Sequence, residues 1–263
     1  MKTGISIFFL LLLLFTALPA SADHHNEEDR PAEHSEFTPA FRLASITKYR
    51  DWDFQLNLSG EFRNESADFY ELQTVLYYRV FRHLKVGVLY SLQKGERHDD
   101  DWITEGDGWF WRDSSDRYEN LIGADITPRA LLPFLPGRNW LISAKSRYSY
   151  NLNNEQQKIL FRPELSYFHM KNRSLRWSIS SAYALYFPIN FSDALLYEHG
   201  PYLSFTMHIN KNLLLGLSGD YLMRNWSSSE AYKNAGGEYL IQDQRYRLGA
   251  SLIWKIDIRD KKR

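Results

Sequence analysis

Residues 53–63 read DFQLNLSGEFR, and this stretch decides the fold class because its apolar and polar residues alternate. One face carries Phe54, Leu56, Leu58, Gly60 and Phe62, and the other face carries Gln55, Asn57, Ser59, Glu61 and Arg63. Successive side chains of a β-strand point to opposite faces, whereas a helix would mix these two sets. The stretch therefore predicts a strand that separates two differently solvated environments.

The same alternation recurs along the chain, clearly at residues 175–187 and 246–256, and predicts ten strands. The predicted strands are residues 53–63, 69–81, 84–94, 117–127, 139–150, 157–170, 174–187, 197–209, 212–224 and 240–256. Most of them span 11 to 14 residues, whereas strands of soluble domains usually have about 5 to 6. Such lengths match a tilted membrane-spanning strand of about 9 to 11 residues together with its rims.

Helical membrane spans are not expected in this chain. After residue 22 no apolar run reaches the roughly 18 residues that a spanning helix requires. In lipid, only helices and closed barrels satisfy every backbone polar group. We therefore expect an all-β fold, a transmembrane antiparallel up-and-down β-barrel of about ten strands that occupies residues 51–256.

The segments outside the predicted barrel have different compositions. Residues 1–22 start with a basic residue, continue with an apolar run and end on the small residues ASA, which is typical of a cleaved signal peptide. The alternative is an N-terminal membrane anchor, but the apolar run is short for a span of about 20 residues. We expect residues 23–50 to be a disordered acidic periplasmic leader and residues 257–263 to be a charged C-terminal tail.

The predicted connections mostly alternate between short and long. Short turns are expected near residues 82–83, 171–173 and 210–211, and long loops at 95–116, 188–196 and 225–239. Because outer-membrane barrels have short periplasmic turns, this parity places the short turns and both chain ends in the periplasm. Residues 128–138 (PRALLPFLPGR) break the pattern, and we expect them to lie at the membrane interface.

The last predicted strand carries a more specific signal, because aromatic and aliphatic residues occupy every second position from Tyr246 to Ile256. In this pattern the chain resembles the bacterial outer-membrane β-barrel class, whose C-terminal strand is read by the barrel-assembly machinery. The class usually ends on an aromatic residue, whereas this chain continues to Arg263. The resemblance implies a Gram-negative outer membrane, porin-like architecture, and outer-membrane lipids and the assembly machinery as partners.

In a membrane the apolar face of each strand meets lipid, so the polar face lines the lumen. The lumen then carries many charged residues, and a barrel of about ten strands is close to the size that side chains alone can fill. We expect a largely filled lumen, with either a structural role or a narrow pore. The predicted charge network consists of Glu61, Arg79, Lys145, Arg147, Arg162, Glu164, Arg176, Asp220 and Arg247.

The loop at residues 95–116 is strongly acidic and also contains three tryptophans. Hard cations such as Ca²⁺ prefer clusters of oxygen ligands, so a divalent-cation site is one hypothesis and an acidic surface loop without metal is the other. The spacing does not match an EF-hand loop. The candidate ligands are Asp99, Asp100, Asp101, Glu105 and Asp107.

Composition excludes several other functions. The chain has no Cys, which excludes disulfides, thiol catalysis and Cys-ligated metals. Its 32 basic residues balance 32 acidic ones, and this neutrality argues against a nucleic-acid partner. No cofactor is expected.

Two alternative functions remain open at this stage. An outer-membrane hydrolase would need a nucleophile beside a base, and the weak candidates are His208, Asp220 and Ser204, which share the inward face of neighbouring strands. No catalytic motif supports them. A soluble exported barrel that binds a ligand would place its apolar face inward. Aromatic residues near strand ends favour the membrane instead, and they are Trp140, Trp177, Tyr197, Trp226 and Trp254.

Overall fold

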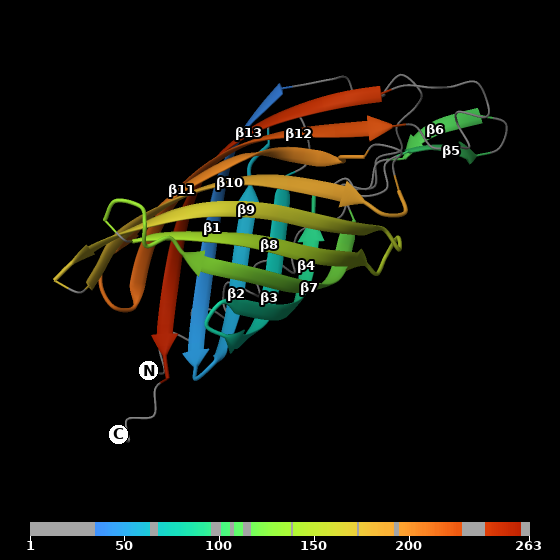
Figure 1. Cartoon of the computed structure of the whole chain (residues 1–263). Helices are drawn as coiled ribbons and strands as arrows, with labels where there is room; N and C mark the ends of the chain where they lie inside the picture. Colours follow the sequence, from blue (N-terminus) through green and yellow to red (C-terminus); the bar gives the residue numbers. More distant parts are fainter. Residues whose placement is uncertain are drawn as a thin grey trace.

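The computed structural model describes residues 35–63, 68–95, 101–105, 108–112, 117–137, 139–172, 174–191, 195–227 and 240–258. Within these residues the chain is all-β, and eleven strands close into one barrel (Figure 1). The barrel strands are β1 (Ser35–Tyr49), β2 (Trp52–Glu61), β3 (Phe69–Phe81), β4 (Leu84–Lys94), β7 (Tyr118–Leu131), β8 (Trp140–Asn151), β9 (Gln157–Lys171), β10 (Ser174–Pro188), β11 (Glu198–His208), β12 (Leu213–Ser227) and β13 (Leu240–Asp257). The prediction of an all-β barrel is confirmed, with eleven strands in place of about ten.

Two further strands form a separate hairpin inside the acidic loop. β5 (Asp101–Glu105) pairs with β6 (Gly108–Arg112) as a two-stranded antiparallel sheet. Among the described residues there is no helix with the length and apolar character needed to cross a membrane.

The additional barrel strand is β1, and it corrects the prediction that residues 23–50 form a disordered leader. Residues 35–49 of that segment pair with a neighbour on each side. The reason is alternation that the acidic start of the segment concealed: Glu36 and Thr38 are buried, whereas Phe37 is 55% exposed. Residues 1–34, which include the predicted signal peptide, lie outside the described residues, as do residues 259–263.

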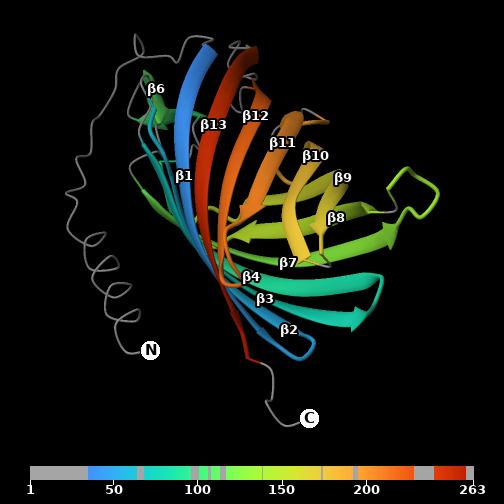
Figure 2. The ribbon, with the colours of Figure 1, turned by 90° about the vertical axis from the view of Figure 1, so that its left-hand side faces the viewer.

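Strand β1 closes the barrel with an unusual pairing. It runs antiparallel to β2 but parallel to β13, so that Ser35 lies opposite Gln244 and Lys48 opposite Asp257. Figure 2 shows β1 and β13 side by side. A meander with an odd number of strands must close in this way. The start of β1 and the end of β13 therefore lie at opposite ends of the barrel, and the prediction of ends on one side is wrong for these strands.

The end of the barrel where β1–β2, β3–β4, β9–β10 and β11–β12 are joined by short connections is here called the turn end, and the opposite end the loop end. Two turns contain non-glycine residues with positive φ, Arg50 at 53° and Asn172 at 51°. In the β11–β12 turn, Asn210 Oδ1 accepts hydrogen bonds from the backbone nitrogens of Asn212 (2.8 Å) and Leu213 (2.9 Å). These local bonds fix the turn that the sequence predicted at residues 210–211.

The predicted interface segment 128–138 also joins strands at the turn end. It is shorter than expected, because β7 continues to Leu131 and pairs there with Leu141 of β8. Phe134 in the remaining connection is 77% exposed, and the Trp140 indole nitrogen donates to the Pro136 carbonyl oxygen at 2.9 Å.

The barrel has its apolar side chains outside and its polar side chains inside. Leu217 and Leu248 on the outer face are 60% and 58% exposed, whereas the inward Glu61 and Asp125 are 3% and 4% exposed. The hydrophobic cluster of buried residues in the described part consists only of Val75, Tyr77 and Leu89. The interior is therefore a polar lumen and not a hydrophobic core.

Candidate functional site

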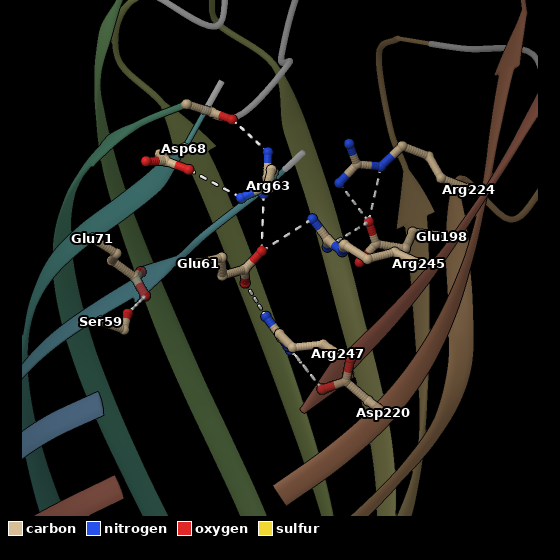
Figure 3. A network of polar contacts seen from close by, with 11 residues as sticks. Ser59, Glu61, Arg63, Asp68, Glu71, Glu198, Asp220, Arg224, Arg245 and Arg247 are labelled. Carbon is tan, nitrogen blue, oxygen red and sulfur yellow. Dashed lines mark hydrogen bonds and ion pairs between the residues drawn. The ribbon is translucent and has the colours of Figure 1, made fainter. Parts of the chain in front are cut away.

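The barrel lumen is the candidate functional site, because alternation sends the charged residues of the strands into it. One group of seven residues lies near the loop end on β2, β11, β12 and β13 and directly after β2 (Figure 3). We call it the loop-end cluster, and its members are Glu61, Arg63, Glu198, Asp220, Arg224, Arg245 and Arg247.

Glu61 is the centre of the loop-end cluster. Its carboxylate is 3.0 Å from Arg63, 3.4 Å from Arg245 and also paired with Arg247, and its side chain is only 4% exposed. Arg247 extends the cluster, because it donates twice to Asp220 at 2.8 and 2.9 Å. The Glu61 carboxylate thus holds three guanidinium groups, and it shares the guanidinium of Arg247 with Asp220.

The cluster continues to β11 through Glu198. Arg224 donates to Glu198 from two nitrogens at 2.7 and 2.9 Å, and Arg245 lies 4.0 Å from the same carboxylate. Arg245 therefore links the Glu61 and Glu198 halves of the cluster, as Figure 3 shows.

Two residues of β1 with short side chains explain how the Glu61 side chain of β2 reaches β13. Strand β1 lies between β2 and β13, with Ala40 opposite Glu61 and Thr38 opposite Arg247. Neither side chain is long enough to separate the carboxylate from the guanidinium. The ion pair therefore crosses over β1 inside the lumen.

A second group, the mid-barrel cluster, consists of Tyr77, Asp125, Lys145 and Arg147 on β3, β7 and β8. Arg147 donates to both oxygens of Asp125, at 2.6 and 2.9 Å. The Tyr77 hydroxyl donates to the same carboxylate at 2.7 Å, and Lys145 lies 3.0 Å from it. Because the Asp125 side chain is fully buried, this carboxylate depends entirely on these partners.

Basic residues continue from the mid-barrel cluster towards the turn end. The Lys85 ammonium lies 3.8 Å from the centre of the Tyr77 ring and 3.0 Å from Asp53. Asp53 is also 3.7 Å from Lys48 of β1. A chain of alternating charges therefore connects β1, β2, β4 and the mid-barrel cluster.

Glu71 on β3 is stabilised in a different way. Its carboxylate accepts hydrogen bonds from Ser91 at 2.6 Å, from Gln73 and Gln93 at 3.0 Å each, and from Ser59 at 3.3 Å. These neutral donors satisfy the carboxylate by hydrogen bonding without neutralising its charge.

Of the nine predicted network residues, the structure brings seven together in three groups. Glu61, Asp220 and Arg247 belong to the loop-end cluster, Lys145 and Arg147 to the mid-barrel cluster, and Arg162 lies 3.6 Å from Glu164 on β9. Arg79 points towards the lumen near Asp53 but has no ion pair within the described residues. Arg176 is exposed, because a register shift between Leu175 and Trp177 interrupts the strand there.

The predicted network lacks several lumen residues that make contacts in the structure, namely Arg42, Arg63, Asp125, Glu198, Arg224 and Arg245. Arg42 was assigned to the leader, so its strand was not recognised. Arg245 shares the inward face with Arg247, two residues away, and the alternation of β13 could have found it.

The weak catalytic candidates do not assemble into a site. Ser204 lies opposite Ser218, His208 lies opposite Leu214, and Asp220 lies opposite Tyr202. Ser204 and His208 are four residues apart on one strand, a separation of about 13 Å at the usual rise per residue. Asp220 is occupied by Arg247.

The candidate metal ligands of the acidic loop lie at positions whose side chains fall outside the described residues. In the described part no group of three or more His, Asp or Glu residues could hold a metal ion.

One predicted interfacial aromatic residue is placed differently from the others. Tyr197 is 6% exposed and packs against Phe191, with ring centres 5.1 Å apart. Trp254, in contrast, is 53% exposed on the outer face, and the side chain of Trp226 lies outside the described residues.

No protein-family model matches the chain, and a search of curated proteins gives no match either.

Proposed function

We propose that the chain is a bacterial outer-membrane β-barrel whose lumen is largely filled by charged side chains, with a structural or narrow-pore role. The observation that carries the proposal is the inverted polarity of the barrel. Large apolar side chains are exposed on all eleven barrel strands, including Phe37 on β1, Val88 on β4 and Leu217 on β12.

This outer face is too apolar for water. Soluble monomers rarely expose contiguous apolar patches larger than a few hundred square ångströms, and hiding apolar surface from water is worth roughly 25 cal/mol per Å². A lipid environment removes that cost. It also demands that no backbone group at the sheet edges stays unpaired, which barrel closure provides.

A row of aromatic side chains supports the same proposal. Trp140 on β8, Tyr167 on β9 and Trp177 on β10 follow one another with ring centres 5.0 and 5.6 Å apart, and Phe205 on β11 lies 6.0 Å beyond Trp177. The row runs across four neighbouring strands near the turn end. Aromatic girdles of this kind mark membrane interfaces.

The C-terminal strand agrees with recognition by the barrel-assembly machinery. Its outward residues Tyr246, Leu248 and Trp254 are exposed, with fractions of 46%, 58% and 53%. In the closed barrel these residues therefore point outward, as the lipid-facing residues of a membrane-spanning strand would.

The loop-end cluster supports a narrow or closed lumen. It ties β2 to β13, β12 and β11 across the inside of the wall, and it involves four arginines and three carboxylates. Long side chains that are held in ion pairs occupy the space that an open pore would need. We expect low conductance from the wild-type protein.

Two measurements test the proposal. The protein should fractionate with outer membranes, resist carbonate extraction and migrate faster on unheated SDS gels than after boiling. Complete extraction by carbonate would refute the membrane assignment.

Conductance in planar bilayers tests the filled lumen. The variant Glu61→Ala removes the centre of the loop-end cluster and should raise single-channel conductance above that of the wild type. The matched variant Glu155→Ala removes an exposed carboxylate outside the strands and should leave conductance unchanged. A large stable conductance from the wild type would refute the filled lumen and favour an open pore.

A further inference from the structure

Two arginines inside the barrel are poorly neutralised by the protein. Arg42 on β1 donates to the neutral amide oxygen of Asn57 at 2.6 Å, and it forms no ion pair within the described residues. Arg162 on β9 is 3.6 Å from Glu164, and its Nε atom is buried without a hydrogen-bond partner. In contrast, every arginine of the loop-end and mid-barrel clusters makes an ion pair at 3.4 Å or less.

These two arginines approach each other from opposite walls. In the closed strand order β9 is five strands from β1 in one direction and six in the other. Even so, the Arg42 guanidinium lies within electrostatic range of Tyr202, Glu71 and Arg162, and the Tyr202 ring centre is 5.7 Å from the Arg162 guanidinium. The two guanidiniums on opposite walls are therefore close enough to interact, with the Glu71 carboxylate also in range of Arg42.

Solvent reaches this level of the lumen. Arg42 is exposed to solvent although its side chain points inward, towards Asn57. It lies opposite Ser251 of β13 and Ser59 of β2, which places it closer to the turn end than Glu61. The loop-end cluster lies beyond it, towards the loop end.

Small residues line one half of the wall on the inner face. Strands β10 to β13 line this part of the lumen with hydroxyl groups and glycines, whereas β3, β7 and β8 carry the bulky mid-barrel cluster. The hydroxyl residues are partly accessible to solvent. The inward small residues are Ser180, Ser204, Gly216, Ser218, Gly249 and Ser251.

We propose that Arg42 and Arg162 form a binding site for a small polyvalent oxyanion that enters the lumen from the turn end. The site rests on the proposed function, because it assigns a ligand class to the same lumen. Guanidinium groups bind carboxylates and phosphates through two parallel hydrogen bonds. Two guanidiniums on opposite walls fit a ligand with two anionic groups, and the serine hydroxyls supply further donors.

The hydrogen-bond donors of the two guanidiniums favour an anion over a cation. Asp125 is already shared by Arg147 and Lys145, and Glu71, although still charged, takes its hydrogen bonds from neutral donors and makes no ion pair with either arginine within the described residues. Within the described residues Arg162 is paired with Glu164 at 3.6 Å, a distance that leaves capacity for a second anion. An incoming oxyanion would accept hydrogen bonds from the two guanidiniums, whereas a cation would be repelled by them.

Titration calorimetry on the full-length protein in detergent tests the site. Pyrophosphate and citrate are the probes, each in a chloride buffer, and they distinguish phosphate from carboxylate chemistry. Binding of either probe by the wild type is expected. Because each guanidinium would donate charge-assisted hydrogen bonds to the ligand, Arg42→Gln and Arg162→Gln should each weaken binding by about tenfold or more.

A matched control and a conservative variant make the test specific. Arg176→Gln removes the same charge from an exposed position and should bind like the wild type. Arg42→Lys keeps the charge but loses the forked geometry, so its affinity should lie between those of the wild type and Arg42→Gln. Each variant is first shown to migrate faster unheated than boiled, which establishes a folded barrel.

Two outcomes overturn the site. One is the absence of heat from both probes with folded wild-type protein, and the other is equal weakening by Arg176→Gln, which would indicate nonspecific charge attraction. The membrane assignment is tested independently by carbonate extraction. If the protein is extracted completely, that assignment is refuted, but the calorimetric measurement still shows whether the lumen binds the oxyanion.

Discussion

Replacing Asp125 by asparagine should be among the most damaging single changes in the lumen. The carboxylate is fully buried and is held by both Arg147 contacts, by Lys145 at 3.0 Å and by the Tyr77 hydroxyl at 2.7 Å. Asparagine has nearly the same shape, so packing is retained. What changes is the charge, because two basic groups lose their shared counter-ion.

The expected cost follows from the burial of this group. Breaking a buried ion pair by removing one partner costs about 3–5 kcal/mol, since an uncompensated charge stays behind. The remaining amide oxygen can still accept one hydrogen bond, so we expect the lower part of that range, about 3 kcal/mol. Adding Arg147→Gln to Asp125→Asn should recover part of the loss, because one of the two orphaned charges is then removed.

Urea titrations of the folded protein in lipid vesicles measure this cost, with tryptophan fluorescence and unheated gel migration as independent probes. The matched control is Glu164→Gln, which removes the same charge from a pair at 3.6 Å. The Arg162 and Glu164 side chains are 32% and 23% exposed, and exposed pairs contribute only about 0–1 kcal/mol.

The comparison gives a clear refutation. If Asp125→Asn lowers the free energy of unfolding by less than about 1 kcal/mol, the mid-barrel cluster does not behave as a desolvated ion pair. If Glu164→Gln lowers the free energy of unfolding as much as Asp125→Asn does, burial does not determine how much each lumen ion pair contributes to stability.

Three further changes test the outer face, the additional strand and one close backbone contact. Leu217→Arg should impair vesicle insertion more than the inward Ser218→Arg, because a midplane arginine on the lipid face costs about 2–4 kcal/mol; equal insertion yields would mean that the facing is reversed. A mature protein that starts at residue 35 should give a heat-modifiable monomer. One that starts at residue 50 lacks β1, the shared neighbour of β2 and β13, and should not. Comparing gel migration of unheated and boiled samples tests this difference. Gly200→Ala should reduce folding yield because its methyl group would collide with the Tyr221 carbonyl oxygen, whereas Gly219→Ala, where the nearest atom is 3.8 Å away, should fold normally.

The two faces of the barrel could be predicted because strand alternation has a period of two. Residues 53–63 illustrate this: Asp53, Asn57 and Glu61 are buried inside, and Phe54 is 45% exposed outside. A one-residue shift would exchange the faces, so the pattern determines orientation once the solvent outside is assumed to be lipid.

The ion-pair partners could not be predicted in the same way, because they depend on neighbours across the barrel. Glu61 and Arg247 are separated by 186 positions in the chain and by one intervening strand. Their contact requires both the closure of β13 on β1 and the short side chain of Ala40. The prediction that Arg176 joins the lumen network is wrong for a local reason, because a register shift beside this residue interrupts the alternation.

Strand β1 was missed because composition outweighed periodicity in its assignment, and its contacts show why it nevertheless joins the barrel. Gly60 on β2 leaves room for the Phe41 ring, which also packs against Phe62 with ring centres 5.8 Å apart. This aromatic contact joins β1 to β2 on the outer face, next to the one parallel pairing among the described strands.

The eleventh strand also determines what the lumen can bind. Barrel diameter grows with strand number, so β1 widens the lumen as well as contributing Arg42 to it. Without β1, β13 would have to close on β2, and the Ala40 gap that lets Glu61 reach Arg247 would disappear along with Arg42. The loop-end cluster and the proposed oxyanion site therefore depend on the same strand, so we expect a loss of β1 to abolish both together.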